Sequence, residues 1–174
     1  LLMLSSLSFV STSRGIREAN EFSFGPIAEV ACLFVGIFIT MQVPIEILRA
    51  RGAEAGLDAP LQYFWATGLL SSFLDNAPTY VVFFEMAGMN TSAAGPLLGD
   101  VTTATGYVPV LLLQAISAGA VFMGANTYVG NGPNFLVKSI AEQRGIKMPT
   151  FLGYMTYSAV LLLPVFILVS FLFF

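Results

Sequence analysis

The sequence predicts an all-α polytopic membrane protein. Of its 174 residues, 56% are hydrophobic and only 10% are charged, with a mean hydropathy of +0.82, whereas a soluble domain carries roughly 25% charged residues. The apolar residues form long runs, and a helix needs about 20 of them to cross roughly 30 Å of hydrocarbon. Two polar stretches, 75–79 and 126–134, interrupt these runs. We therefore expect membrane helices, two of which are broken.

Charge and residue types exclude several other classes of protein. The net charge is −3 and the sequence has no basic cluster, so it lacks the electrostatic footprint of a nucleic-acid binder. A single cysteine, Cys32, and the absence of histidine remove the reagents for disulfide frameworks, zinc sites and Ser/His/Asp or Cys/His catalysis. We expect no enzyme and no catalytic residue.

Five apolar segments follow one another along the chain. Residues 1–10 are apolar without an initiator methionine or a basic region before them, which predicts the end of a truncated membrane helix rather than a signal peptide. After a polar loop, Pro26 stands where proline is tolerated at the start of a helix. The remaining predicted segments are a transmembrane helix over 26–48, a segment over 61–87 interrupted at 75–79, a discontinuous helix over 108–144 broken at 126–134, and a final transmembrane helix over 150–174.

The segment 61–87 has two interpretations, because neither half alone is long enough to cross the membrane. It is either one interrupted helix or a re-entrant hairpin whose two short helices meet at 75–79. Under either reading, five of the Lys and Arg residues in the short loops lie on one side of the membrane and two lie on the other. Both readings place the loop 138–149 in the cytoplasm and Phe174 outside, so the count does not choose between them.

The two interruptions are the strongest functional signal. Lipid offers no hydrogen bonds, so irregular backbone at membrane depth must be buried in protein or line a water-filled cavity. Pro78 removes a backbone donor, while Asp75 and Asn76 can cap the helix that follows. Broken helices expose carbonyl and amide groups, from which transporters build ion and substrate sites. Because an ionisable group at bilayer depth costs about 2.5 to 3.5 kcal/mol, Asp75 is the leading functional candidate.

At these residues the sequence resembles the ion-transporter superfamily, which includes arsenite permeases, NhaD-type sodium/proton antiporters, citrate transporters and dicarboxylate symporters. The resemblance is closest to the citrate-transporter and sodium/proton-antiporter members and covers nearly the whole chain. It is carried by AEVACLFVGIFIT, SSFLDNAPTYVVF and GANTYVGNGPNFLVKSIAE.

The resemblance implies two inverted repeats, each with a re-entrant hairpin and a discontinuous helix. The chain then corresponds to the C-terminal repeat, with 75–79 as the hairpin tip and 126–134 as the unwound stretch. Phe174 outside agrees with the family's external C-terminus, and the re-entrant hairpin of the family's repeat favours the hairpin reading of 61–87. A missing N-terminal half would supply the rest of the site. The protein would reside in the bacterial cytoplasmic membrane and could form a homodimer.

The sequence departs from the dicarboxylate members, whose hairpin tips read Ser-Asn-Thr, because Asp75 occupies the corresponding region. A fixed carboxylate would repel citrate but attract sodium or hold a proton. Sodium/proton antiport therefore ranks first, and cation-coupled transport of citrate or a related organic acid or oxyanion is the alternative. No cofactor is expected beyond sodium or a proton as the coupling ion.

The expected site combines residues of both interruptions. Asp75 would carry the proton and would join Asn76, Thr79 and Asn126 in holding sodium. The full set expected to bind ion or substrate is Asp75, Asn76, Pro78, Thr79, Asn126, Thr127, Gly130, Asn131, Gly132 and Asn134.

Two rival classes also use buried acids. An intramembrane aspartyl protease needs two facing aspartates, and Asp100, in a loop of small polar residues, is the only other aspartate near the membrane segments. A cation channel would also use carboxylates and carbonyls, and single-channel currents would distinguish it from a carrier.

Overall fold

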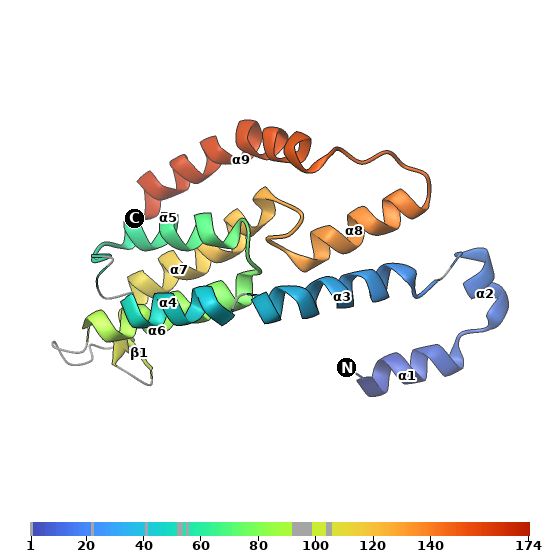
Figure 1. The fold of residues 1–174 in the computed structure, drawn as a ribbon, viewed down its shortest axis with the longest axis horizontal. Coiled ribbons are helices and arrows are strands. Elements are labelled where there is room, and N and C mark those ends of the chain that lie inside the picture. The colour runs from blue at the N-terminus through green and yellow to red at the C-terminus, as the bar shows by residue number, and fades with distance from the viewer. Residues whose placement is uncertain are drawn as a thin grey trace.

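A computed structural model describes residues 2–21, 23–40, 42–51, 54, 56–91, 99–103 and 106–174. In Figure 1, α5, α6 and α7 lie together at one end of an elongated molecule, and α3 and α8 extend toward the other. The elements in chain order are α1 (Leu2–Ser11), α2 (Arg14–Ala19), α3 (Gly25–Thr40), α4 (Gln42–Arg51), α5 (Pro60–Ser71), α6 (Asn76–Thr91), β1 (Val101–Thr102), β2 (Tyr107–Val108), α7 (Val110–Met123), the 3₁₀ helix η2 (Gly124–Asn126), α8 (Gly132–Gln143) and α9 (Phe151–Phe173).

Helices make up about 76% of the structure, so the predicted all-α class is confirmed. Within the described ranges, one short antiparallel pair departs from it: β1 pairs with β2, with Val101 opposite Val108 and Thr102 opposite Tyr107. β1 lies in the loop around Asp100 that the sequence predicts, and β2 lies just after it. Residues 92–98 and 104–105 lie outside the described residues.

Helix length separates α9 from the other apolar helices. Over the part of the chain that the structure describes, α9 alone is both long and apolar enough to cross a membrane. The segment predicted as one helix over 26–48 is occupied by α3 and α4, and Met41 between them lies outside the described residues. The predicted discontinuous helix is occupied by α7, η2 and α8.

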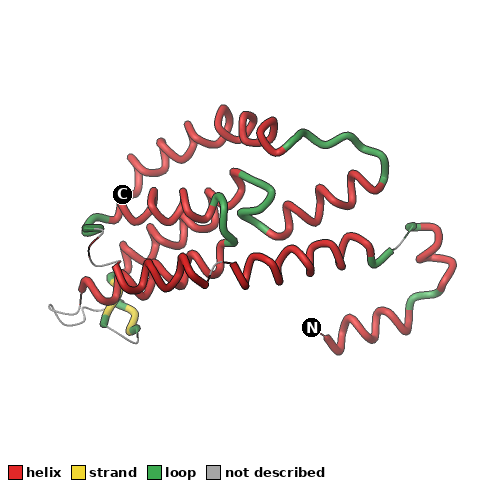
Figure 2. Tube along the Cα trace, in the orientation of Figure 1, coloured by secondary structure: helices red, strands yellow, loops and turns green. Residues whose placement is uncertain are grey.

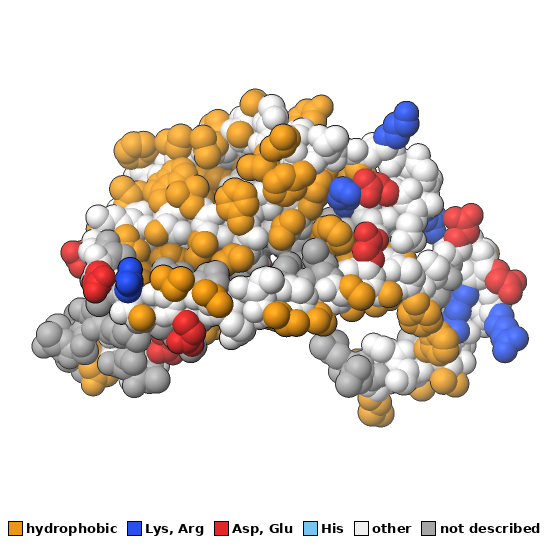
Figure 3. Space-filling model, in the orientation of Figure 1, with side chains coloured by type: hydrophobic (Ala, Val, Ile, Leu, Met, Phe, Trp, Pro, Cys, Tyr) orange, Lys and Arg blue, Asp and Glu red, His pale blue; other side chains and the backbone are white. Residues whose placement is uncertain are grey.

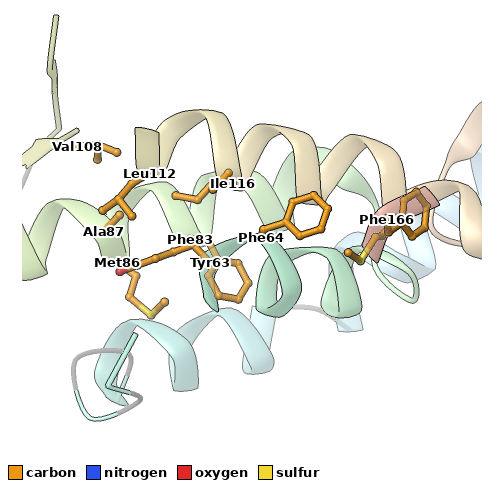
Figure 4. Close-up of a cluster of buried hydrophobic side chains, with 11 residues drawn as sticks. Tyr63, Phe64, Phe83, Met86, Ala87, Val108, Leu112, Ile116 and Phe166 are labelled. Carbon is orange, nitrogen blue, oxygen red and sulfur yellow. The ribbon is translucent and has the colours of Figure 1, made fainter. Parts of the chain in front are cut away.

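A buried apolar cluster holds the pair α5–α6 against α7. The two helices run antiparallel from a short turn and both pack on α7 (Figure 1). Tyr63 and Phe83 face each other edge-on, with ring centroids 6.5 Å apart. Figure 4 shows the cluster, whose buried members include Tyr63, Phe64, Phe83, Met86, Ala87, Val108, Leu112, Ile116 and Phe166.

Close backbone contact fixes how α5 lies along α7. A Cβ atom added to Gly119 of α7 would collide with the carbonyl oxygen of Phe64 and would come within 3.3 Å of the amide nitrogen of Gly68. Small residues allow membrane helices to approach this closely. The contact sets the depth of the α5–α6 pair and brings its turn to the end of α7.

A second pairing joins α3 to α8. The Ser139 hydroxyl of α8 donates a short hydrogen bond to the Glu29 carboxylate of α3. Near the other end of the contact, Gly132 of α8 lies so close to the Phe34 ring that a Cβ atom would overlap it. The two helices therefore run antiparallel, and Glu29 links α3 to α8.

The surface is apolar over the middle of the molecule. On the face shown in Figure 3, hydrophobic side chains cover the central region, and the charged side chains lie toward the two ends. Along α9, Leu161 is 65% exposed and Leu172 is 67% exposed. An exposed apolar surface of this extent suits contact with hydrocarbon rather than with water.

Candidate functional site

The turn between α5 and α6 lies just before the predicted tip. It spans Ser72 to Asp75, and the Asp75 carboxylate accepts a hydrogen bond of 3.2 Å from the Ala77 amide, which caps α6. Pro78 and Thr79 then lie in the first turn of α6. Amides there have no partner within the helix, so a proline costs little.

The second interruption separates α7 from α8. After η2, Thr127 takes an extended conformation (φ −137°, ψ 166°), and Asn131 is extended as well (φ −152°, ψ 114°) before α8 begins. The Asn131 side chain makes no hydrogen bond to the start of α8. Figure 2 shows this loop beside the α5–α6 turn, so the two interruptions meet.

Two serines at the end of α5 fasten the turn to α7. Ser71 Oγ donates to the Ala120 carbonyl over 2.7 Å, and Ser72 Oγ donates to the Met123 carbonyl over 3.0 Å. In return, Asn126 Nδ2 donates to Ser72 Oγ over 3.0 Å. We call the junction the group Ser71, Ser72, Asn76, Asn126, Thr127 and Gly130.

Thr127 is fully buried and closes the loop of the broken helix. Its hydroxyl donates to the Ser72 carbonyl and accepts from the amides of Val129 (3.2 Å) and Gly130 (3.0 Å). A hydroxyl has one proton and two lone pairs. All three are used here, so Thr127 positions the loop and has no lone pair left for an ion.

Asn76 connects α6 to both α7 and the loop. One atom of its side-chain amide lies 2.8 Å from Ser71 Oγ, 2.9 Å from the Ala120 carbonyl oxygen and 2.7 Å from the Gly130 carbonyl oxygen. Because carbonyl oxygens only accept hydrogen bonds, this atom is the amide nitrogen. Asn76 therefore acts as a donor that joins the turn to the broken helix.

Three backbone carbonyl oxygens converge beside Gly130. A Cβ atom added to this residue would lie 2.8 Å from the Gly124 oxygen, 2.9 Å from the Ser72 oxygen and closer still to the Ser71 oxygen. Only glycine allows the backbone to approach so closely. The junction thus has a concentration of partial negative charge at the ends of α5 and α7.

The first turns of α9 support the same region. Tyr154 donates to the Ala125 carbonyl over 3.0 Å, and Ser158 donates to the Asn126 carbonyl over 2.8 Å. Each bond uses one of the two lone pairs of a carbonyl oxygen. The Asn126 carbonyl therefore keeps one lone pair for an ion, and its side-chain oxygen is a second candidate donor.

Thr79 is a predicted site residue with a buried, unused polar atom. Its side chain is 1% exposed, and among the described residues its hydroxyl has no hydrogen-bond partner. An unpaired buried hydroxyl costs roughly 1 to 3 kcal/mol. An ion or a water molecule beside the first turn of α6 would remove that cost.

The structure brings some predicted site residues together and separates others. Asn76, Asn126, Thr127 and Gly130 meet at the junction, and Asp75 caps α6 next to it. Gly132 instead faces Phe34 of α3, while Asn131 and Asn134 are half-buried at the start of α8.

Ser71 and Ser72 were missed as site residues. Their signal in the sequence was a pair of hydroxyls at the end of an apolar helix, directly before the interruption.

Oxygen atoms dominate the chemistry available here. The junction supplies carbonyl, hydroxyl and amide groups, with the Asp75 carboxylate adjacent. Within the described ranges, His, Cys, Asp and Glu form no group of three or more that could hold a metal ion. The donors present are those that hard cations prefer.

Apolar helices that break at an internal, oxygen-lined junction define a membrane transporter. The whole chain, residues 1–174, matches the protein family described as "Putative citrate transport", and the protein belongs to that family. The resemblance to the citrate-transporter members is thereby confirmed. None of the curated proteins and none of the solved structures compared with the chain matches it.

Proposed function

We propose that the protein is a sodium/proton antiporter of the cytoplasmic membrane, in which the junction binds sodium and Asp75 carries the proton. The observation that carries the proposal is the convergence of the Ser71, Ser72 and Gly124 carbonyl oxygens beside Gly130. Sodium is a hard cation that binds oxygen donors. A second repeat of the same transporter would complete the site, and the whole would function as a monomer or homodimer.

Helix polarity supports cation binding at the junction. The C-terminal ends of α5 and α7, which carry partial negative charge, both lie there. The N-terminal end of α6 would disfavour a cation, but the Asp75 carboxylate caps it. Helix ends carry about half an elementary charge, so this arrangement leaves the region beside Gly130 attractive to a cation.

Asp75 has one oxygen engaged and one available. Its Oδ1 accepts from the Ala77 amide, and the hydrogen bonds of the described residues include none to Oδ2. In the proposed cycle, Oδ2 binds a proton when sodium leaves and releases it when sodium returns. Thr79, whose buried hydroxyl lacks a partner among the described residues, would contribute a further oxygen.

Contacts at one end of the molecule support the re-entrant hairpin. Arg144, after α8, donates to the Asn20 carbonyl over 2.6 Å, and Gln143 lies against Gly25. The loops 11–25 and 138–149 must then lie on the same side of the membrane. They share a side if α5 and α6 form a hairpin and would be on opposite sides if that segment crossed the membrane.

Replacing Asp75 with asparagine tests its assigned role. Asparagine caps helices about as well as aspartate, so Asp75→Asn should preserve α6 while removing the titratable group. In everted vesicles that contain the full-length variant, we expect normal protein levels and thermal stability but no sodium-driven proton movement. Asp58→Asn, the same change in an exposed loop, is the matched control. Normal exchange by Asp75→Asn would refute the role.

Sodium-coupled citrate transport is the second candidate. It is favoured by the family description and by the start of α8, where the Asn131 side chain leaves the helix N-terminus uncapped. Pro133 has no N–H and the Asn134 amide donates to the Asn131 carbonyl, so a carboxylate there would meet the Gly132 amide and the positive end of the helix dipole. Uptake of labelled citrate with and without sodium separates the candidates: saturable, sodium-dependent uptake would establish citrate transport, and its absence together with proton exchange would establish antiport.

A further inference from the structure

A groove runs along α7 toward the junction. Its wider part, about 730 Å³, lies between α7 and the end of α9 and is lined by residues that include Gln114, Ser117 and Phe174. Its narrower part, about 390 Å³, lies at the start of α6 and is lined by residues that include Asn76, Tyr80 and Ser117. Ser117 and Val121 line both parts, so the two hollows lie next to each other along α7.

Two polar side chains line this groove without partners. Gln114 is exposed and Ser117 is half-buried, and within the described part of the chain neither makes a hydrogen bond. A polar group in hydrocarbon without a hydrogen bond costs free energy. Polar side chains in membrane helices accordingly face a protein interior or a water-filled cavity.

The spacing of these groups leads to Asn76. Residues three apart on a helix lie on the same face, so Gln114, Ser117 and Ala120 form one row. The carbonyl of Ala120 accepts the amide of Asn76. The row from Gln114 to Ala120 is about 9 Å long at 1.5 Å per residue, and it connects the wide part of the groove with the junction.

The membrane orientation gives the groove a direction. Phe174 lines its wide end, and the count of Lys and Arg places that terminus outside. The narrow end reaches Asn76 at the hairpin turn. The groove therefore opens toward the external end of the molecule.

We propose that this groove is a water-filled external access route for sodium, along which the Gln114 and Ser117 oxygens replace part of the ion's hydration shell. The inference rests on the proposed binding of a cation at the junction. Most of the groove lining is apolar, and the side chains of Gln114, Ser117, Asn76 and Tyr80 add oxygen atoms along it. No lining side chain is charged, so a monovalent cation would be held only weakly on its way to the junction. Lipid or another protein segment filling the groove is the competing outcome.

Cysteine accessibility provides the test. Cys32 is the only cysteine of the 174 residues and is exposed. Cys32→Ser, combined with replacement of any cysteine in the rest of the full-length protein, gives a clean background for Ser117→Cys and Gln114→Cys. Right-side-out vesicles are treated with a membrane-impermeant, cationic methanethiosulfonate. We expect both thiols to react, and the reaction at 117 to be slower in sodium than in choline, because the ion would occupy the same path.

Val165→Cys is the matched control. Val165 on α9 is 50% exposed, lines neither part of the groove, and lies about as far from the external end of its helix as Ser117 does, roughly 10 to 12 Å. We expect it to react at least about tenfold more slowly, because only the thiolate is reactive and it forms in water. Equal reactivity of Ser117→Cys and Val165→Cys would overturn the proposal.

A second variant covers the case in which a cysteine prevents folding. Ser117→Ala, which should fold because it only removes a hydroxyl, is expected to raise the sodium concentration needed for half-maximal exchange. An unchanged value would refute the role of Ser117. If Ser117→Cys reacts as expected but Asp75→Asn still exchanges sodium for protons, the access route stands and the proposed proton carrier is wrong.

Discussion

Replacing Asn76 tests how the α5–α6 turn is fastened to the broken helix. Its amide nitrogen lies within 2.9 Å of the Ala120 and Gly130 carbonyl oxygens and of Ser71 Oγ. Asn76→Ala removes both amide protons from these acceptors. Interhelical hydrogen bonds in membrane proteins contribute about 0.6 kcal/mol each on average, so the alanine variant should lose roughly 1 to 2 kcal/mol of stability.

Asn76→Asp keeps the shape of the side chain but reverses its chemistry. A carboxylate oxygen would face two carbonyl oxygens, and an uncompensated buried charge costs about 3 to 5 kcal/mol. The aspartate variant should therefore be less stable than the alanine variant by roughly 2 kcal/mol, a difference of about thirtyfold in the unfolding equilibrium at 1.4 kcal/mol per factor of ten.

Unfolding of the purified full-length protein in detergent micelles, followed by circular dichroism, measures both variants. Asn20→Asp, at an exposed position, controls for the added charge and should leave the unfolding midpoint unchanged. An aspartate variant that is as stable as the wild type would show that donation from the Asn76 amide nitrogen to these carbonyl oxygens does not stabilise the junction. The reasoning about the junction's donors would then be wrong.

Substitutions at three further positions test other contacts by the same unfolding measurement. Gly130→Ala should lower the free energy of unfolding by about 1 to 3 kcal/mol, as overpacking does, because its Cβ atom would overlap surrounding carbonyl oxygens. A variant as stable as the wild type would show that these carbonyl groups do not approach Gly130 so closely. Tyr154→Phe removes a hydrogen bond to the Ala125 carbonyl and should cost about 1 kcal/mol, whereas an unchanged midpoint would mean that α9 does not support η2 through this bond. Glu29→Ala should cost about 1 to 2 kcal/mol of stability through loss of the hydrogen bond from Ser139. Glu29→Gln, which retains an acceptor, should cost less. Equal losses in the two variants would show that the charge of Glu29, not its hydrogen bond, stabilises the fold.

The interruptions could be found from the sequence because their signal is local. Pro78 and the glycines of 126–134 stand out in apolar runs, and irregular backbone in a membrane demands a reason. The same local logic anticipated the cap that Asp75 provides for α6. The predicted turn lies a few residues too late in the chain, because a proline in the first turn of a helix does not end that helix.

The roles of individual residues at the junction required the tertiary structure. Thr127 looked like an ion ligand, but its hydroxyl is saturated by contacts from the α5–α6 turn and from its own loop. The Asn126 carbonyl already accepts one hydrogen bond, from Ser158, more than thirty residues later in the chain. Hydrogen-bond saturation depends on partners distant in sequence, which no local pattern reveals.

The sequence by itself therefore determined that the protein is helical, belongs in a membrane and is broken at two places, because composition, apolar run length and helix-breaking residues act locally. Only the tertiary structure decided that the two breaks meet and that Ser71 and Ser72 join them. It also decided which oxygens remain free, because packing through Gly119 and the Asn76 bonds sets the depth of the hairpin against α7.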